Sequence, residues 1–510
     1  MIRCLSGGHV GQYDFNPIFG GFMIVTLISP PLMDIQNGRL APISMDAVRT
    51  CPPYGTYLLA SVLRQQGHDV RIIDLISQGS KVLSSHWATL AGSQLIGIGV
   101  SSLSWPTAKT LISEIREALS NIPIVLGGIH ATMFDGWLLS TTDATFVVRG
   151  EGEISLPRLC AVLEYGGDIR QVPNLTYKAL SGNIVRTTVT AVLDEQSLAR
   201  LPAPDYSLLP AGVYTGLGIE SSRGCPFDCS FCSTAHRKSW RGISPEQFVD
   251  KVTAILPYTS LTRKGLVQII DDEFTVKTDR AIQICHIFAE RNITPRIVFD
   301  TRANDLNKEP FVEAVQPYAH QFLVGAECGY DEGLKKIGKG TTVERLEDAA
   351  QLLGRYGMAS KADFSFIIGL PWETEKDVLK TVHFAFHLYS TYGVRVLLQW
   401  YCQIPGSRLW EEQRRKQILH ESMYDDYGFF RDHYLFRTGV PLLPSEVLHV
   451  HTTITALQSL SGTNDEGMEM FQTSPPFQVM QFFPQTAQPT FSSGLAGLRE
   501  TAGVDVNPNK

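Results

Sequence analysis

The stretch SRGCPFDCSFC, residues 222–232, decides the fold of the second half of this chain. It places Cys225, Cys229 and Cys232 in the spacing C-x-x-x-C-x-x-C. The apolar segment at 217–220 directly before it is typical of a short buried strand. The three cysteines are therefore expected on a loop at the end of a strand, where side chains can converge on one ligand.

Thiolates at this spacing can bind three irons of a 4Fe-4S cubane and leave the fourth iron open to another ligand. The alternative is half of a zinc site, which needs a fourth ligand, usually from a second Cys or His pair. His236 lies nearby, but the sequence contains no such pair at a recognisable spacing. The spacing therefore favours the iron–sulfur cluster.

Downstream of the cysteines, strand patterns alternate with helical patterns. The segment 244–247, SPEQ, combines a capping box with a proline at the first helical position. Six strand–helix units suggest a partial barrel, whose site lies at the C-terminal ends of the strands. The predicted strands are 217–220, 266–270, 296–299, 322–326, 363–368 and 394–400.

Upstream of the cysteines, the same alternation predicts a parallel sheet with helices on both faces. A hairpin is expected between 175 and 187, and ligands bind such sheets outside the carboxyl ends of the strands. Small, polar or glycine-rich segments occupy those ends and leave room for a large flat ligand. The strands are 24–28, 70–73, 95–100, 122–126 and 144–148, and the helices are 54–66 and 107–119.

Composition excludes several classes of function. The formal net charge of -7 provides no basic stripe for nucleic acid, so we expect no nucleic-acid partner. No apolar run is long enough to span a membrane and the first residues do not resemble a secretory signal, so we expect a cytoplasmic protein without membrane contact. The remaining cysteines are scattered and are expected to be small buried residues.

The motif C-x-x-x-C-x-x-C after the first barrel strand, with Phe231 before the last cysteine, resembles the radical S-adenosylmethionine (SAM) superfamily. Other segments at successive strand ends are similar to the SAM-binding elements of that family. Taken singly, these residues have structural explanations, such as a helix cap, an ion pair or a tight turn. The resemblance implies SAM contacts from Asp271, Asp272, Glu273, Arg302, Glu327 and Gly369.

The N-terminal segments SPP at 29–31, GGIHAT at 127–132 and VRGEGE at 148–153 resemble a cobalamin-binding domain. No D-x-H-x-x-G hexapeptide occurs, so the resemblance is to the branch without a protein histidine on cobalt. His130 is expected in a loop, bonded to the backbone or to a cobalamin amide rather than to the metal. The implied cobalamin contacts are Ser101, Ser102, Gly127, Gly128, His130, Gly150 and Glu151.

The expected fold class is α/β: a doubly wound, Rossmann-like cobalamin-binding domain, then a partial (β/α)6 radical SAM barrel of the TIM type, then a short, partly disordered C-terminal region. The corresponding ranges are 1–22 for an extension, 23–190 for the cobalamin domain, 191–213 for a linker, 214–430 for the barrel, and 431–510 for a helical segment and loose tail. Within the last range a helix is expected at 445–460.

The resemblance implies an enzyme that methylates an unactivated carbon, or phosphorus, of a small molecule through a 5'-deoxyadenosyl radical and methylcobalamin. It also implies an electron donor such as flavodoxin or ferredoxin. Two alternatives stay open: a cobalamin-dependent cyclase or rearrangement enzyme without methyl transfer, and a non-catalytic cobalamin or redox sensor.

We predict that replacing Cys225, Cys229 or Cys232 with Ala abolishes both bound iron and SAM cleavage, because each thiolate holds one iron of the cubane. Iron content and 5'-deoxyadenosine formation measure the effect. Replacing Cys285, which falls within a helical pattern, should leave the cluster intact. A cluster-cysteine variant with a full cluster and normal SAM cleavage would contradict the assignment.

Overall fold

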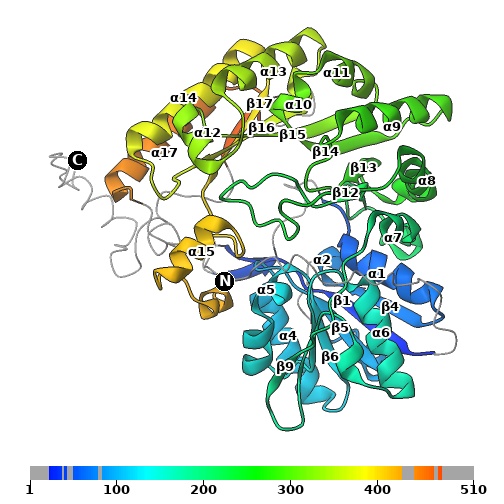
Figure 1. Ribbon diagram of the computed structural model, residues 1–510. Coiled ribbons are helices and arrows are strands. Elements are labelled where there is room, and N and C mark those ends of the chain that lie inside the picture. Colours follow the sequence, from blue (N-terminus) through cyan, green and yellow to red (C-terminus); the bar gives the residue numbers. More distant parts are fainter. Residues whose placement is uncertain are drawn as a thin grey trace. The chain divides into compact units, whose positions relative to one another are not determined.

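The computed structural model describes residues 22–36, 39–42, 50–78, 83–427, 441–463 and 469–473 (Figure 1). Residues 1–21 of the predicted extension and 474–510 of the predicted tail lie outside this described part. The chain forms two compact units. The first contains residues 1–226, 234–298 and 421–427, and the second contains 227–233, 299–420 and 428–510.

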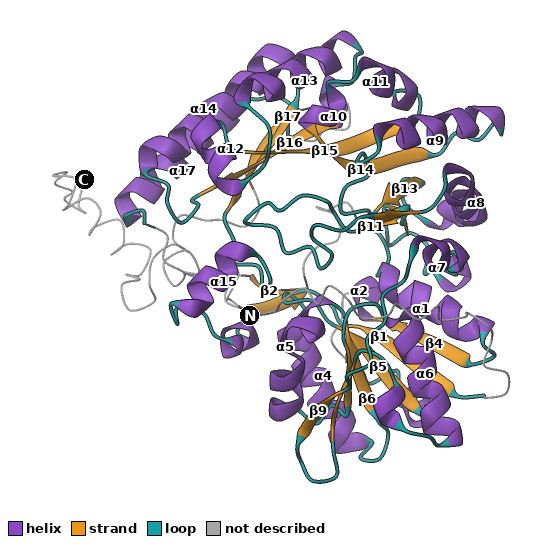
Figure 2. Ribbon diagram, in the orientation of Figure 1, coloured by secondary structure: helices purple, strands orange, loops and turns teal. Residues whose placement is uncertain are grey.

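The N-terminal sheet of the first unit has the strand order β4-β1-β5-β6-β7-β8-β9 (Figure 2). Strands β4, β1, β5, β6 and β7 run parallel to one another. Strands β8 and β9 form the predicted hairpin, which pairs antiparallel with β7. The strands are β1 (Ile24–Ser29), β4 (Asp69–Asp74), β5 (Leu95–Gly99), β6 (Ile124–Gly127), β7 (Phe146–Val148), β8 (Leu175–Lys178) and β9 (Ile184–Arg186). A separate antiparallel pair consists of β2 (Met33–Gln36) and β3 (Arg39–Pro42).

Helices pack around this sheet and bury its apolar side chains. Val25, Leu63 and Leu159 all belong to one buried cluster. The main helices are α1 (Tyr54–Gln65), α4 (Trp105–Ala118), α5 (Ile129–Thr141) and α6 (Gly152–Tyr165), and the shorter ones are α2 (Leu75–Gln78), α3 (Trp87–Ala91) and α7 (Glu195–Arg200). Neither α5 nor α6 is among the helices predicted from the sequence. The α5 segment, IHATMFDGWLLST, is apolar on most sides and so lacks the polar face that reveals a helix.

The second sheet has the order β10-β13-β14-β15-β16-β17-β18, and β14 passes from the first unit into the second. Strand β13 pairs in parallel with β10 and β14. Strand β16 pairs in parallel with β15 and β17, and β17 also pairs in parallel with β18. The strands are β10 (Gly216–Ile219), β13 (Leu266–Ile269), β14 (Arg296–Arg302), β15 (Ala319–Glu327), β16 (Ala362–Ile368), β17 (Arg395–Trp400) and β18 (Phe471–Thr473). The first six confirm the predicted strands of the partial barrel.

Helix α8 (Pro245–Ile255) begins at the capping box that the sequence predicts in segment 244–247. Ser244 Oγ accepts a hydrogen bond from Gln247 N at 3.2 Å, which confirms the capping box of α8. The helices are α8 (Pro245–Ile255), α9 (Thr278–Glu290), α10 (Ala303–Leu306), α11 (Glu309–Val315), α12 (Asp331–Ile337), α13 (Val343–Arg355), α14 (Glu375–Tyr392), α15 (Arg408–Arg415) and α17 (Pro444–Ser459).

The C-terminal region departs from the prediction of a loose tail from residue 461. Strand β18 pairs with β17, and Phe471 is fully buried, with its ring centroid 5.7 Å from that of Phe386. A strand of three residues is too short to show an alternating pattern, so tertiary contacts and not local sequence determine it. The helix predicted at 445–460 is present as α17.

Within the described ranges, no helix combines the length and the apolar character that crossing a membrane requires.

Candidate functional site

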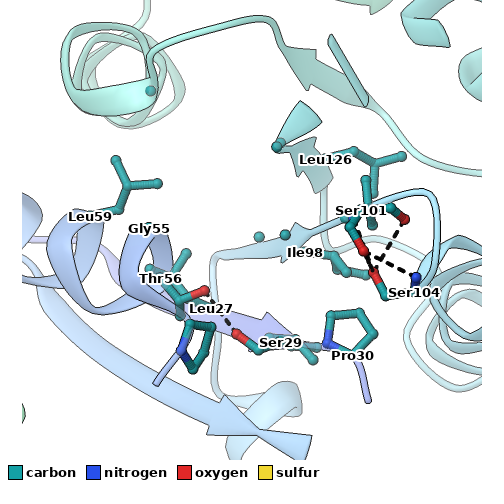
Figure 3. A pocket seen from close by; sticks show the side chains of 18 of the residues that line it. Leu27, Ser29, Pro30, Gly55, Thr56, Leu59, Ile98, Ser101, Ser104 and Leu126 are labelled. Carbon is teal, nitrogen blue, oxygen red and sulfur yellow. Dashed lines mark hydrogen bonds between the residues drawn. The ribbon is translucent and has the colours of Figure 1, made fainter. Parts of the chain in front are cut away.

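A cavity of about 500 Å³ opens at the carboxyl ends of β1, β5 and β6 (Figure 3). Its walls are mostly aliphatic, from residues such as Leu27, Leu59 and Leu126. The polar side chains that line it carry hydroxyl groups: Ser29, Tyr54, Thr56, Ser101 and Ser104. Among the described lining residues there is no histidine and no charged side chain.

Hydroxyl pairs keep part of this wall rigid. Ser29 Oγ lies 2.8 Å from Thr56 Oγ1, and Ser101 Oγ donates to Ser104 Oγ at 3.1 Å, as the dashed lines in Figure 3 show. These pairs join the end of β1 to α1 and close the turn that precedes α4. The hydroxyls satisfy one another, so the cavity can accept an apolar surface without leaving a buried donor unpaired.

Glycine is required at the turn after β6. Gly128 has a φ of 95°, and a Cβ at this position would lie 2.6 Å from the Val100 carbonyl oxygen. Gly127 and Gly150 also line the cavity, and a Cβ on either would meet open space. These turns leave backbone exposed to a ligand, which suits the close approach of a wide, flat ring.

The structure separates the predicted cobalamin residues into two groups. Ser101, Gly127, Gly128 and Gly150 line the cavity, whereas Ser102, His130 and Glu151 do not. Sequence reasoning did not include Thr56, Tyr54 or Ser104 among the contacts, although Ser29 belongs to the segment 29–31 that resembles a cobalamin-binding domain.

His130 lies in the first turn of α5 and not in a loop as expected. Its ring is fully buried, stacks on Trp105 at 5.3 Å between centroids and lies edge-on to Tyr424. Ser102 Oγ is 3.0 Å from Nδ1, and Nε2 has no hydrogen-bond partner among the described residues. Burial lowers the pKa of His130 to about 3, so the imidazole is neutral at physiological pH. These contacts hold the ring among aromatic side chains.

The cysteine loop connects the two strands of a short antiparallel ribbon, β11 (Ser222–Arg223) and β12 (Arg241–Gly242). In the first unit, Gly224 has a φ of 84°, and Cys225 N donates to His236 O at 3.3 Å. In the second unit, Cys232 N donates to Cys229 O at 3.2 Å. Backbone hydrogen bonds therefore fix the chain at Cys225 and, separately, the turn from Cys229 to Cys232.

The thiols themselves are free of disulfides, and Cys229 is 8% exposed. Burial raises the pKa of Cys229, and the charge of Lys339 partly offsets this effect. Within the described residues, no three His, Cys, Asp or Glu side chains are grouped closely enough to hold a metal ion. The chemistry of Cys225, Cys229 and Cys232 suits a cubane, because three thiolates are the ligands that such a cluster uses, although the described structure does not bring the three side chains together.

The acidic run after β13 braces the cysteine loop. Asp271 is buried and accepts hydrogen bonds from Ser221 N and Ser222 Oγ, both at 2.6 Å. Asp272 Oδ2 accepts from Gly224 N at 3.0 Å, and its Oδ1 accepts from Thr234 Oγ1 at 2.7 Å. Asp272 thereby spans the loop from before Cys225 to after Cys232.

Glu273 makes a local contact instead, because its Oε1 accepts a hydrogen bond from Thr275 Oγ1 at 2.6 Å. The predicted SAM contacts of all three acids stay predictions, and their observed hydrogen bonds are structural.

Arg302 and Glu327 lie in the second unit, at the ends of β14 and β15. The Arg302 guanidinium stacks over Phe227 at 3.5 Å from the ring centroid and also donates to the Lys339 carbonyl. Lys339 Nζ donates to Glu327 Oε1 at 2.7 Å, and both side chains are 9% exposed. Burial lowers the pKa of Lys339, but the charges of Glu327 and Cys229 outweigh it and the net shift is upward.

Glu327 has a φ of 67°, which is unusual for a residue with a side chain, and it follows a register shift in the pairing of β15 with β16. Such strain persists where the surroundings demand it and often marks a functional site. Sequence reasoning missed Lys339, whose position in a loop gives no local pattern.

Gly369, the last predicted SAM residue, has a φ of 77° after β16. A Cβ there would lie 2.7 Å from Trp400 Cε3, so only glycine fits beside this ring. Nearby, Glu373 is fully buried and accepts from Leu370 N at 2.8 Å and from the Tyr330 hydroxyl at 3.0 Å. Burial raises the pKa of Glu373 to about 7.

Comparison with known proteins matches both halves of the chain. The radical SAM superfamily profile matches residues 219–385, and the B12 binding domain profile matches residues 44–160. An uncharacterized methyltransferase of Pyrococcus horikoshii is 30% identical over 384 residues, which are 72% of this chain and 80% of the relative.

An anaerobic magnesium-protoporphyrin IX monomethyl ester cyclase of Synechocystis is 27% identical over 61% of this chain and 64% of the relative. Among solved structures, the radical SAM methyltransferase TsrM from Kitasatospora setae has a TM-score of 0.65 at 17% identity, covering 93% of this chain and 95% of TsrM. This last likeness supports the fold.

We predict that Asp272→Ala lowers the iron retained per chain and lowers the melting temperature by only a few degrees. The variant loses two hydrogen bonds that hold the loop ends, together worth about 1–3 kcal/mol. Iron and sulfide assays after reconstitution, with thermal melting, provide the measurement. Glu114→Ala, which removes an exposed carboxylate from α4, serves as the control. Full cluster content in Asp272→Ala would show that the brace is dispensable.

Proposed function

Because the chain belongs to the radical SAM superfamily and carries a B12-binding domain ahead of the radical SAM domain, we propose that it methylates an unactivated carbon, or phosphorus, of a small molecule. One observation carries the proposal: the two domains occur together in a chain that is 30% identical to a methyltransferase over 80% of that relative. The radical SAM domain implies a 4Fe-4S cluster and SAM, and the B12-binding domain implies cobalamin.

When bound, these cofactors supply the difficult chemistry: the reduced cluster cleaves SAM to a 5'-deoxyadenosyl radical, and cobalamin carries the methyl group. The protein contributes binding, orientation and exclusion of water. Cys225, Cys229 and Cys232 would hold the cluster irons, with Asp272 bracing their loop. Arg302 and Glu327 provide a cation and a carboxylate at neighbouring strand ends in the second unit, which suits the charged groups of SAM.

The cavity at the ends of β1, β5 and β6 would hold the cobalamin ring. Gly127, Gly128 and Gly150 expose backbone to a flat ligand, and Leu59 and Leu126 cover apolar ring surface. Ser101 and Thr56 also line the cavity, and their hydroxyl oxygens have lone pairs that can accept further hydrogen bonds from polar substituents of the ligand. His130 points into an aromatic cluster and not into this cavity, so it is not proposed as a contact to cobalt.

A second candidate function is ring closure or rearrangement without methyl transfer. The 27% identity to a cyclase over 61% of the chain specifically favours it. Both functions use the same cofactors and the same cysteines. The fate of the SAM methyl group therefore distinguishes them.

The remaining parts of the proposal concern the surroundings of the enzyme. Reduction of the cluster needs an electron donor, for which flavodoxin or ferredoxin has suitable chemistry. We place the reaction in the cytoplasm, where thiols stay reduced, in keeping with free cysteines among the described residues. The boundaries 23–190 and 214–430 remain our proposal for the two domains.

We predict that bound cob(II)alamin shows no nitrogen splitting from a lower axial ligand in its electron paramagnetic resonance spectrum. Among the described residues that line the cavity, none has a side-chain nitrogen base. His130→Ala should leave the spectrum unchanged. Splitting by one nitrogen that disappears in His130→Ala would overturn this assignment.

We also predict that, with SAM carrying a trideuterated methyl group, the product retains all three deuteriums, because transfer of an intact methyl group breaks none of its C–H bonds. Mass spectrometry should also find 5'-deoxyadenosine and S-adenosylhomocysteine in equal amounts. If 5'-deoxyadenosine forms with the true substrate, without S-adenosylhomocysteine or label in the product, cyclisation or rearrangement replaces methylation.

A further inference from the structure

Two arginines face each other at the base of the cysteine loop. Arg223 and Arg241 are direct partners across the β11–β12 ribbon, whose two strands enter and leave that loop. Their side chains are only 13% and 12% exposed. Like charges directly opposite on an antiparallel pair repel each other, and poor access to water strengthens the repulsion. The ribbon therefore needs an anion between its strands.

Glu151 of the N-terminal sheet region supplies that anion. Its Oε1 lies 3.3 Å from Arg223 Nη1 and 2.9 Å from Arg241 Nη2. Its Oε2 accepts from Leu193 N at 2.7 Å. Burial alone would raise the pKa of Glu151, but the hydrogen bond from Arg241 and the two guanidinium charges lower it overall, so the carboxylate is ionised at neutral pH.

Two further carboxylates complete the cluster around Arg223. Glu153 Oε1 lies 2.5 Å and Glu220 Oε1 lies 2.6 Å from Arg223 Nη2. Glu153 follows β7 in sequence, whereas Glu220 directly follows β10. Residues from the cobalamin-binding half and from the barrel half thus share one guanidinium within the first unit.

The same turn that presents Glu151 and Glu153 also forms the wall of the cavity. Gly150 and Gly152 line the cavity, and a Cβ on Gly152 would lie 3.3 Å from Leu59. Gly150 and Gly152 therefore face the cavity, whereas Glu151 and Glu153 contact the arginines of the β11–β12 ribbon. A ligand that fixes the position of this turn also fixes the carboxylates.

We propose that Glu151 and Glu153 are positioning residues that couple occupancy of the cobalamin cavity to order in the cysteine loop, through Arg223 and Arg241. Cobalamin against the 150–152 turn holds the two carboxylates in place, and these hold the ribbon from which the cluster ligands extend. Coupling is reciprocal, so a cluster on the loop tightens cobalamin binding by the same factor. The inference rests on the proposed use of both cofactors and is independent of methyl transfer.

The test is an anaerobic equilibrium titration of the full chain with hydroxocobalamin, with and without a reconstituted cluster. The wild-type dissociation constant should be on the order of tenfold lower with the cluster. In Glu151→Gln, which keeps the side-chain shape but removes the charge, the ratio of the two constants should fall to about one. A purely structural loss would weaken binding in both forms and leave the ratio unchanged.

Two other variants make the outcome decisive. Asp135→Asn removes another buried carboxylate of the same half, paired with Arg186 at 2.7 Å, and should keep the wild-type ratio. Glu153→Gln removes one negative charge beside Arg223 and leaves the contacts of Glu151 in place, so it should lower the ratio partially. It decides the question if Glu151→Gln does not fold. The inference is overturned if the ratio of the two dissociation constants is one in the wild type. It is also overturned if a glutamate variant that folds keeps the ratio of the wild type. Absence of any cobalamin binding overturns the proposed function instead.

Discussion

The charge balance at Arg223 is the constraint on which the arrangement of the first unit depends. Its guanidinium lies opposite Arg241 across the ribbon and contacts Glu151, Glu153 and Glu220. Removing one partner of a buried ion pair typically costs about 3–5 kcal/mol, because the other charge is left without compensation. The base of the cysteine loop is therefore anchored by the nearby Glu220 and by Glu151 and Glu153, which lie far away in the sequence.

Backbone conformation imposes the second constraint. Gly128 and Gly369 adopt positive φ angles at positions where a Cβ would meet the Val100 carbonyl or the Trp400 ring. Both follow strands of parallel sheets, where ligands bind beyond the carboxyl ends. Glu327 accepts comparable strain although it has a side chain, and its ion pair with Lys339 holds it there. The chain therefore adopts unusual backbone conformations at the strand ends, which is where ligands bind in sheets of this kind.

Burial decides the role of a polar group beside the cavity of the first unit. His130 follows a glycine pair beside the cavity, yet its ring is enclosed by Trp105, Phe134 and Tyr424 and stays neutral. Tyr424 comes from the segment 421–427, which packs in the first unit although it follows the barrel strands in sequence. Because aromatic side chains enclose the ring, the His130 imidazole does not reach a ligand in the cavity.

Local sequence patterns were sufficient to predict the cysteine motif, the first six barrel strands, the parallel N-terminal sheet and the glycine turns around the cavity. These features follow from local spacing and from apolar periodicity, which act over a few residues. Tertiary contacts alone establish that Asp272 spans the loop ends, that Glu151 lies between two arginines, that Lys339 pairs with Glu327 and that Phe471 belongs to a strand that extends the second sheet. Each of these depends on contacts between residues distant in sequence, and the energy of a buried charge or a short strand depends on which neighbours the fold brings to it.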